Sequence, residues 1–342
     1  MRRFLSLFVL SCCVLSWVAV PVAHAGRERP PEWVRPALKY LVDQGYFSRE
    51  GFEADEPMAR RVFKRLMSNA FEGGYRRTKG FVTAGEVGAS LVRKLGFTEL
   101  ATSLSDVRSP DGWDPDLSKR FGTEVVAREL GLRHDRPTNE EMHEAAEAQP
   151  ITQGDAVWAV WQAKTSPDEW AAEALTSFSL GDYGGMRQRV VKFALSLVGT
   201  PYVWGGEWLT ETADGYPYGA QPKGGVDCSG FAWYVLQAKS DNYQPVDRSY
   251  KGWSIPERSS AEMAKAAPKR LRIKEMQAGD ILFFAPEGRD AKATDVYHAG
   301  IYLGEGWMIH SSGSRDGISL ASVGPGSWWR DQIFGGRKVI TR

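Results

Sequence analysis

The sequence is poor in cysteine, in histidine and in net charge. Its 342 residues include three cysteines and five histidines, and 43 basic against 42 acidic residues leave a formal net charge of +1. Cys12 and Cys13 lie near the N-terminus, so Cys228 is the one thiol in the rest of the chain. A single thiol there excludes an internal disulfide framework and a zinc site built from several thiolates. The near-neutral charge gives no electrostatic argument for nucleic acid.

The first residues predict export from the cell. A basic start precedes a mostly apolar run over residues 4–22, and Ala23-His24-Ala25 matches the small-x-small pattern of a cleavage site. We therefore expect residues 1–25 to be a secretory signal peptide that is removed, which leaves no stable membrane insertion. An uncleaved anchor is the alternative, because the apolar run is just long enough to span a bilayer. After cleavage Cys228 stands alone in an exported chain, either as a buried hydrophobic residue or as a functional group.

Residues 30–165 have the periodicity of helical hairpins. In the stretch "FVTAGEVGASLVRKLGF", Thr83 is placed as an N-cap and Glu86 follows three residues later, which is a capping box. The stretch "PITQGDAVWAVWQAK" repeats this layout with Thr152 and Asp155. Three segments here begin with a loop and end with a helix, which indicates a weak internal repeat in an all-α region.

This region resembles the S-layer homology repeat. The stretches "SDVRSPDGW" and "PITQGDA" are similar to the two ends of that repeat, and "FEADEPMARRVF" is similar to its middle. The signature arginine is absent at Ala84 and Gln153, and Val62 stands where the repeat has an acid. The resemblance implies binding to a cell-wall polymer, and a plain helical spacer is the alternative.

A different kind of sequence follows a linker at residues 166–185. Residues 186–342 begin with a helix and a turn at Gly199-Thr200-Pro201. Strand-like runs come after them: "DILFFAP", "YHAGIYLG", "GWMIHSS" and "KVIT". Helices followed by an antiparallel sheet are typical of an α+β domain, so we expect this fold class for residues 186–342.

Cys228 stands at the start of the dense apolar run "DCSGFAWYVLQ", which predicts a buried helix with the thiol in its first turn. Unpaired N–H groups and the positive end of the helix dipole favour a thiolate there, so we expect a lowered thiol pKa. A thiolate nucleophile also needs a base, and four histidines lie beyond the predicted signal peptide. His134 and His143 lie among charged residues of the repeat region and are expected at the surface.

The other two histidines, His298 and His310, lie in consecutive strand-like runs joined by "GEG", which suits a hairpin turn. A three-residue loop places both histidines on one face of the hairpin, and a two-residue loop places them on opposite faces. Their pairing is therefore a prediction about strand register. One histidine on a strand is more often structural, but two on one hairpin, downstream of a lone exported cysteine, favour catalysis.

Residues 186–342 resemble the NlpC-type cell-wall peptidases, which are papain-like cysteine enzymes that cut peptidoglycan stem peptides. The resemblance rests on ordered pieces of sequence: "GTPYVWGG", "DCSGF", "IPERSSAEM", "AGDILFF", "YHAGIYLGEGWMIHSS" and the closing "GGRKV". It implies Cys228 as nucleophile, His298 as base and His310 as the polar group that orients the base. It also implies a papain-like domain with N-terminal helices packed on an antiparallel sheet. We expect no cofactor and no catalytic metal.

The resemblance further implies a set of substrate-binding residues. These are Tyr202 beside the nucleophile, Asp227 and Ser229 at the amino end of the peptide, and Arg258 and Ser259 along the groove. Asp227 is equally expected as the N-cap of the helix, and the two roles are compatible. The insertion "EWLTETADGYPYGAQPKGGV" leads directly into Asp227, so we expect it to border the groove.

These features favour a secreted bacterial endopeptidase at the cell wall or cell surface that hydrolyses peptidoglycan stem peptides at the D-glutamyl–diamino acid bond. One alternative is a non-catalytic cell-wall-binding protein in which the peptidase-like domain is only a scaffold. Another makes Cys228, His298 and His310 the ligands of a catalytic zinc. The expected partners are the stem peptide as substrate and a wall polymer at the repeats, without nucleic acid.

Overall fold

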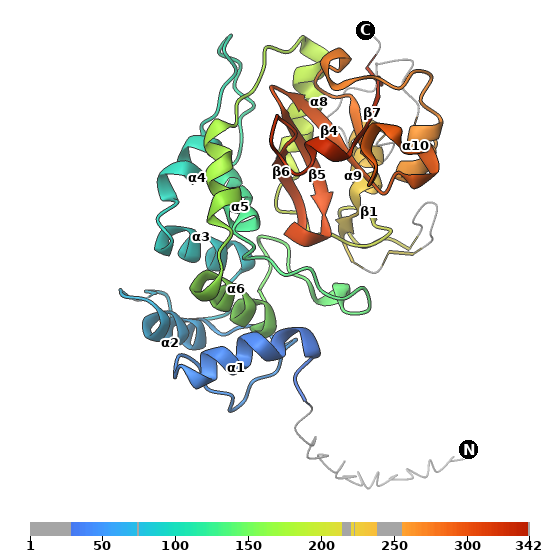
Figure 1. Cartoon of the computed structure of the whole chain (residues 1–342). Helices are drawn as coiled ribbons and strands as arrows, with labels where there is room; N and C mark the ends of the chain where they lie inside the picture. The colour runs from blue at the N-terminus through green and yellow to red at the C-terminus, as the bar shows by residue number, and fades with distance from the viewer. Residues whose placement is uncertain (1–28, 74, 214–219, 222, 238–254, 341–342) are drawn as a thin grey trace, which may run out of the picture.

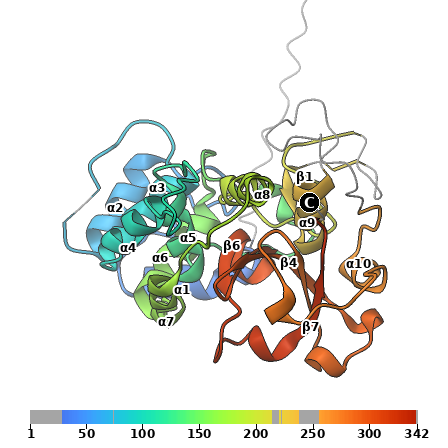
Figure 2. The ribbon, with the colours of Figure 1, turned by 90° about the horizontal axis from the view of Figure 1, so that it is seen from above.

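The computed structural model describes residues 29–340, except residues 74, 214–219, 222 and 238–254. The predicted signal peptide, residues 1–25, lies outside the described residues. Within the described part of the chain, no helix is long and apolar enough to cross a membrane. A helical region (residues 29–165) lies beside a sheet region (residues 185–340), as Figures 1 and 2 show from two directions.

The helical region is built from short helices that carry their own start signals. Thr83 and Glu86 form the predicted capping box, and the Thr152 hydroxyl accepts a hydrogen bond from the Asp155 N–H at 3.2 Å, so both predicted caps are confirmed. The helices are α1 (Arg35–Asp43), α2 (Arg60–Ala70), α3 (Ala84–Lys94), α4 (Thr98–Ser105), α5 (Phe121–Glu129) and α6 (Gln153–Thr165).

Three of these helices begin beside one another at a closed ring of backbone hydrogen bonds. The Met58 N–H donates to the Ile151 carbonyl at 2.9 Å, the Ile151 N–H donates to the Val82 carbonyl at 3.0 Å, and the Val82 N–H donates to the Met58 carbonyl at 3.0 Å. The helices α2, α3 and α6 start two residues after these positions. The three segments that sequence periodicity marked as a weak repeat are therefore joined at equivalent points.

The segment between the two regions packs against the sheet. It forms α7 (Glu169–Ala174) and then lays Phe178 edge-on against Trp307, with ring centroids 5.3 Å apart. The Tyr183 hydroxyl donates to the Leu303 carbonyl. Residues 166–184 thus connect the two regions and also contribute to their common hydrophobic core.

The sheet region combines helices with one main antiparallel sheet. Its elements are α8 (Gly185–Ser196), β1 (Glu207–Trp208), β2 (Gly225–Val226), α9 (Cys228–Gln237), α10 (Ser260–Lys265), β3 (Ile281–Phe284), β4 (His298–Gly304), β5 (Trp307–Ser312), β6 (Gly317–Ser322) and β7 (Ile333–Arg337). The five-stranded sheet has the order β6-β5-β4-β3-β7, and β1 pairs with β2 in a separate two-stranded ladder. Mixed helices and an antiparallel sheet agree with the expected α+β class.

Two strands differ from the sequence prediction. The strand β6 was not anticipated, and β7 precedes the predicted run "KVIT" instead of coinciding with it. In β7 a Cβ atom at Gly336 would lie 2.4 Å from the Met276 sulfur, so glycine is required where strand propensity favours a side chain. Val339 and Ile340 are buried as their apolar character suggests, but they lie after the strand ends.

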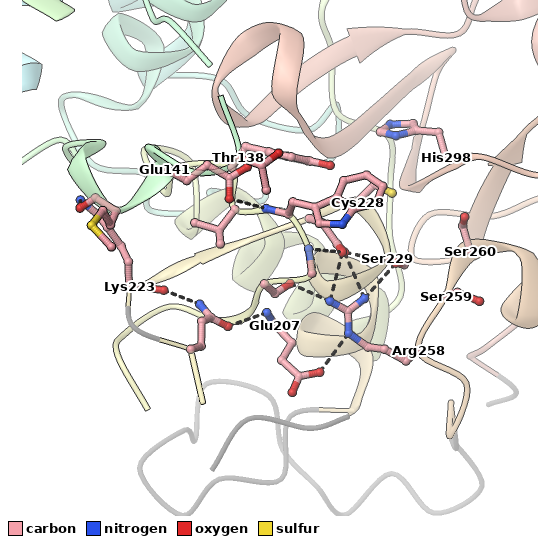
Figure 3. Close-up of a pocket in the computed structure, with 18 of the residues that line it drawn as sticks. Thr138, Glu141, Glu207, Lys223, Cys228, Ser229, Arg258, Ser259, Ser260 and His298 are labelled. Carbon is pink, nitrogen blue, oxygen red and sulfur yellow. Dashed lines mark hydrogen bonds and ion pairs between the residues drawn. The ribbon is translucent and has the colours of Figure 1, made fainter. Parts of the chain in front are cut away.

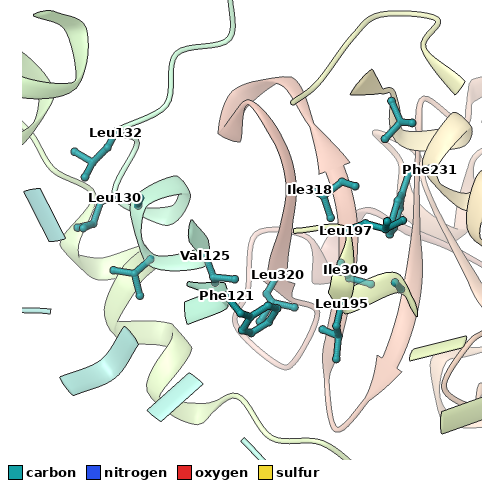
Figure 4. Packing of buried hydrophobic residues seen from close by; sticks show 14 of the residues in the cluster. Phe121, Val125, Leu130, Leu132, Leu195, Leu197, Phe231, Ile309, Ile318 and Leu320 are labelled. Atoms are coloured by element: carbon teal, nitrogen blue, oxygen red, sulfur yellow. The ribbon is translucent and has the colours of Figure 1, made fainter. Parts of the chain in front are cut away.

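One hydrophobic core runs through both regions. In Figure 4, Phe121 and Val125 of α5 face Leu320 of β6, and all three side chains are almost completely buried. Burying each such side chain contributes roughly 1.5–3 kcal/mol relative to leaving it in water. The Ser319 hydroxyl adds a hydrogen bond of 2.7 Å to the buried carboxylate of Glu129 across the same boundary. The helical region is therefore attached to the sheet by packing as well as by the chain.

Candidate active site

The start of α9 is held by a side chain that precedes it. Asp227 Oδ1 accepts a hydrogen bond from the Gly230 N–H at 2.6 Å, which is the N-cap geometry, and its Oδ2 accepts one from the Gly205 N–H at 3.1 Å. The cap places Cys228 at the first helical position. The expected capping role of Asp227 is thus confirmed.

Cys228 is half-buried and opens onto a cavity of about 740 Å³. In Figure 3 its sulfur lies on the same side of the cavity as the His298 ring. The backbone N–H groups of Ser229 and Ala299 lie within hydrogen-bonding reach of the sulfur. Because Ala299 follows His298 directly, this contact brings the start of β4 against the start of α9.

The thiol is less acidic than its position on the helix suggested. Burial and the adjacent Asp227 carboxylate raise the pKa of Cys228 to about 12, against the opposing influence of the two N–H groups and of Arg258. The expectation of a lowered pKa was wrong, because removal of the sulfur from water and a neighbouring negative charge outweigh the helix terminus. The resting group is a neutral thiol.

The two histidines of the hairpin meet on one face. His298 Nε2 and His310 Nδ1 are 2.7 Å apart, and the two rings are nearly perpendicular. The turn between β4 and β5 has two residues, Glu305 and Gly306, both with positive φ. An irregularity between Tyr302 and Gly304 shifts the register by one residue. This bulge restores the shared face that a two-residue turn alone would have lost.

An aromatic shell surrounds the histidine pair. Trp329 stacks on His298 with centroids 4.8 Å apart and meets His310 edge-on at 5.2 Å. Burial lowers the pKa of His298 to about 3, and burial together with the charge of His298 lowers the pKa of His310. Both rings are therefore neutral at physiological pH. Since Nε2 of His298 faces His310, its Nδ1 is the nitrogen left to take the thiol proton.

Three of the predicted substrate-binding residues are bound to one another behind Cys228. Arg258 donates to both carboxylate oxygens of Asp227 at 3.1 and 3.2 Å and to the Ser229 hydroxyl at 2.9 Å. It also pairs with Glu207 at 2.9 Å. All four side chains are buried, yet each borders the cavity (Figure 3). The network therefore fixes the start of α9 beneath the Cys228 thiol.

The other two predicted substrate-binding residues lie at the cavity wall. Tyr202 is half-buried, and burial together with the nearby Cys228 and Asp227 raises its pKa. Ser259 caps α10 in a capping box with Glu262. The insertion also reaches the cavity through Ala220, Gln221 and Lys223. Gln221 is buried and bonds to backbone groups on both sides of the β1–β2 ladder.

Part of the cavity wall comes from the helical region, which the sequence analysis did not anticipate. Thr138, Asn139, Glu141 and Met142 border it, from the loop between α5 and α6 that runs below the sheet in Figure 1. Glu141 accepts a hydrogen bond from the Trp204 N–H at 3.1 Å. No sequence signal marks this loop, because its partners lie more than sixty residues away. Trp329 was missed for the same reason, although the doubled "WW" of "GSWWR" is an aromatic signal.

The remaining histidine predictions have a clear outcome. His134 was expected at the surface, but it is half-buried between Trp33 and Trp158, with centroid distances of 4.6 and 4.1 Å, and burial lowers its pKa to about 4. His143 is half-buried on a short helical turn.

Among the described residues, Cys228, His298 and His310 do not form a metal-ligand cluster. The direct contact between the two histidine rings argues against the zinc alternative, because each ring directs a nitrogen at the other.

Comparison with known proteins shows which family the cavity-bearing part of the chain matches. Residues 199–338 match the NlpC/P60 family. The chain is 31% identical over 140 residues to the gamma-D-glutamyl-L-lysine dipeptidyl-peptidase of Bacillus subtilis (strain 168), covering 41% of this chain and 36% of that protein. It is also 31% identical over 147 residues to the bifunctional muramidase/DL-endopeptidase CwlT of the same organism, covering 43% and 34%. The chain thus spans about a third of the length of these two relatives.

Solved structures give a weaker likeness. The structure of RipD from Mycobacterium tuberculosis, described as a non-catalytic NlpC/p60 domain protein adapted to peptidoglycan binding, is 22% identical. The match covers 46% of this chain and 99% of that one, with a TM-score of 0.31. This likeness carries no functional argument. Peptidase relatives and the geometry around Cys228 are the observations that bear on function.

Proposed function

From the NlpC/P60 domain at residues 199–338, we propose that this protein is a cysteine endopeptidase that hydrolyses peptidoglycan stem peptides. The observation that carries the proposal is the arrangement of Cys228 at the start of α9, with the bonded pair of His298 and His310 beside it at one cavity. The relatives named as a gamma-D-glutamyl-L-lysine peptidase and a DL-endopeptidase support the D-glutamyl–diamino acid bond as the target. We also propose that the helices and the antiparallel sheet of this domain have the arrangement found in papain-like enzymes.

The proposed reaction begins from a neutral pair. His298 Nδ1 takes the proton of Cys228 as the sulfur attacks the scissile carbonyl, because neither group is charged at rest. The N–H groups of Ser229 and Ala299, which lie near the sulfur, are donors for the developing oxyanion. His298 then protonates the leaving amine, and water hydrolyses the thioester. His310 holds the His298 ring through Nε2 and contributes geometry rather than charge.

The direct experiment digests purified peptidoglycan with the full chain and identifies the released fragments by mass spectrometry. We expect fragments that end in D-glutamate and fragments that begin with a free diamino acid. Cys228→Ala should lower the rate by on the order of 1,000-fold or more while circular dichroism stays unchanged. Digestion by Cys228→Ala at the wild-type rate contradicts the proposal. Retention on the wall by the wild type without released fragments supports the second candidate, a non-catalytic wall-binding protein.

The helical region and the location of the protein form a second part of the proposal. The resemblance of the helical region to S-layer homology repeats suggests that it holds the protein on a cell-wall polymer. The relative named as a muramidase/DL-endopeptidase supports an exported, wall-associated location. Full-length protein with the inactive Cys228→Ala change should sediment with intact walls and stay in solution with walls stripped of accessory polymers. Equal sedimentation with both kinds of wall favours the plain spacer.

A further inference from the structure

Three carboxylates from both regions of the molecule converge beside the active-site cavity. Asp135 and Glu144 lie in the loop between α5 and α6, and Asp316 lies just before β6. One oxygen from each of the three lies within 4.8 Å of the others. Glu144 is 1% exposed and Asp316 is 5% exposed, while Asp135 is half-buried. We call these three residues the acid cluster.

Within the described part of the chain, each carboxylate of the acid cluster has a buried oxygen that accepts no hydrogen bond from an N–H or hydroxyl group: Asp135 Oδ1, Glu144 Oε2 and Asp316 Oδ1. The carboxyl groups of Glu144 and Asp316 lie close enough to each other to share a proton. Glu129, a buried acid at the boundary between the two regions, differs, since it accepts from Ser319 at 2.7 Å and pairs with Arg315. Leaving a charged oxygen both buried and unpartnered is costly, so unpaired atoms converging from three side chains point to a missing ligand.

The neighbouring charges leave the acid cluster negative. Arg133 is bonded to Glu124 at 2.6 Å, and Arg136 is bonded to Asp55 and Asp155. Arg128 is the guanidinium whose charge acts most strongly on Asp316, and its Nη1 donates to the Arg315 carbonyl. Among the described residues, the charges of Arg133 and Lys223 also act on the acid cluster, although Arg133 is already paired with Glu124. The three carboxylates are thus only partly neutralised, which favours a bound cation.

We propose that the acid cluster binds a divalent metal ion of the hard class, with Ca²⁺ as the preferred ion. The donors are all carboxylate oxygens, which suit Ca²⁺, Mg²⁺ or Mn²⁺ and not the softer metals that prefer sulfur and imidazole. Two oxygens that share a Ca²⁺ ion at roughly 2.4 Å each lie up to about 4.8 Å apart. The three oxygens lie within this limit of one another, so a single ion can reach all of them. Ca²⁺ is preferred because it accepts irregular sets of carboxylate oxygens, whereas Mg²⁺ demands a near-ideal octahedron.

The ion would fix one wall of the active-site cavity. The chain from Asp135 to Glu144 carries cluster residues at both ends, and the Arg136 N–H donates to Glu144 at 2.9 Å across its base. Thr138, Asn139, Glu141 and Met142, in the middle of this stretch, line the cavity next to Cys228. Binding to Asp316 at the same time ties this stretch to the sheet. The bound ion would therefore fix the shape of the groove. The site does not depend on the proposed peptidase activity.

A shared proton is the competing explanation for the unpaired oxygens. Burial and the adjacent Asp316 raise the pKa of Glu144, and burial raises the pKa of Asp316 although Arg128 and the contact with Glu144 oppose the shift. Burial also raises the pKa of Asp135 to about 7. A proton held between two of the carboxylates relieves part of the repulsion. Protons and a metal ion then compete for the same oxygens, so metal binding should release protons into the buffer.

The experiment titrates chelator-treated, desalted full-length protein with CaCl₂ by isothermal calorimetry at pH 7.5, in two buffers of different ionisation enthalpy. We expect one Ca²⁺ per chain, proton release on binding, and a melting temperature that rises with CaCl₂ concentration. MgCl₂ should bind more weakly. The absence of saturable binding of Ca²⁺, Mg²⁺ and Mn²⁺ up to about 10 mM, above the range of weak extracellular calcium sites, overturns the proposal in favour of the shared proton. Binding of Zn²⁺ alone also overturns it.

Variants separate the acid cluster from other buried acids. Glu144→Gln and the milder Asp135→Asn should each weaken Ca²⁺ binding at least tenfold, and Glu129→Gln is the matched control with a buried acid that has partners. Wild-type affinity in both cluster variants contradicts the site. If a variant does not fold, the wild-type titration still decides the question. Hydrogen exchange of residues 135–144 should also become faster when Ca²⁺ is removed.

Discussion

The protonation state of Cys228 decides how the candidate site begins its reaction. Its pKa of about 12 and the pKa of His298 of about 3 place both groups in their neutral forms over most of the pH range. A resting thiolate–imidazolium pair reacts with alkylating agents at a rate that does not depend on pH around neutrality. A neutral thiol reacts through a small thiolate fraction that grows with pH.

Alkylation by iodoacetamide distinguishes these two states. We expect the rate at Cys228 to rise about tenfold per pH unit between pH 7 and 10, because the thiolate fraction grows in that proportion below the pKa. Intact-mass spectrometry of the chain without residues 1–25, in which Cys228 is the one cysteine, follows a single adduct, and unfolded protein, with an ordinary thiol pKa, is the control. A rate that is constant between pH 5 and 8 identifies a preformed ion pair and contradicts the assignment of a neutral pair.

The proposed role of His310 as a positioning residue gives a second prediction at this scale. His310→Ala frees the His298 ring, which should lower kcat by on the order of 100-fold with little change in KM. His310→Asn keeps a polar group near His298 Nε2 and should recover part of that loss. Wild-type activity of His310→Ala indicates that the hydrogen bond of 2.7 Å has no part in the reaction.

At the scale of single elements, the beginning of α9 depends on a glycine. A Cβ atom at Gly230 would lie 2.0 Å from the Gly206 carbonyl oxygen and 2.8 Å from Arg258 Nη2. The close approach of α9 to this backbone therefore requires a residue without a side chain. The motif "DCSG" thus holds the helix cap, the proposed nucleophile and the packing contact within four positions.

The corresponding test compares two glycines. Gly230→Ala should destabilise the protein by about 2–3 kcal/mol, because the backbone carbonyl in its way cannot move without disturbing the Asp227–Arg258 network. Gly185→Ala, at a helical position with open space around it, should be neutral or slightly stabilising. Urea denaturation measures both. A neutral Gly230→Ala variant shows that α9 can shift without cost.

Sequence reasoning succeeded where the determinants are local. The caps at Thr83 and Asp227 and the strands around His298 and His310 depend on residues only a few positions apart. It failed where the determinants are distant. The glycines of β7 are dictated by Met276 and Arg270, which lie far away in the sequence. The pKa of Cys228 was misjudged in the same way, since helix position is visible in a sequence and depth of burial is not.

At the scale of the whole molecule, titration of the boundary between the two regions affects stability. Burial raises the pKa of Glu129 to about 7 from an ordinary value near 4.5, although Arg315 and Ser319 oppose the shift. The folded protein therefore holds this proton more tightly than the unfolded chain. The stabilisation is complete below about pH 4.5 and is lost as the pH rises through 7.

Glu129→Gln cannot titrate, so its melting temperature should fall less than that of the wild type between pH 5 and 8. Glu262→Gln is the control. Hydrogen bonds from Ser259 lower the pKa of Glu262, so its titration affects stability only at more acidic pH. Scanning calorimetry at several pH values gives the comparison. If the melting temperatures of Glu129→Gln and the wild type change with pH in the same way, this carboxyl group has no important role in the pH dependence of stability.

The hydrogen-bonded ring through Met58, Val82 and Ile151 determines how many repeated segments the helical region can hold. An open array of repeats grows by duplication at either end, since each added copy meets a single neighbour. A ring has no end at which a copy can be added. A fourth segment must break an existing hydrogen bond to enter, and the loss of one segment leaves both of its neighbours unpaired. Copy number is therefore a geometric property of this region, as it is in a cyclic oligomer.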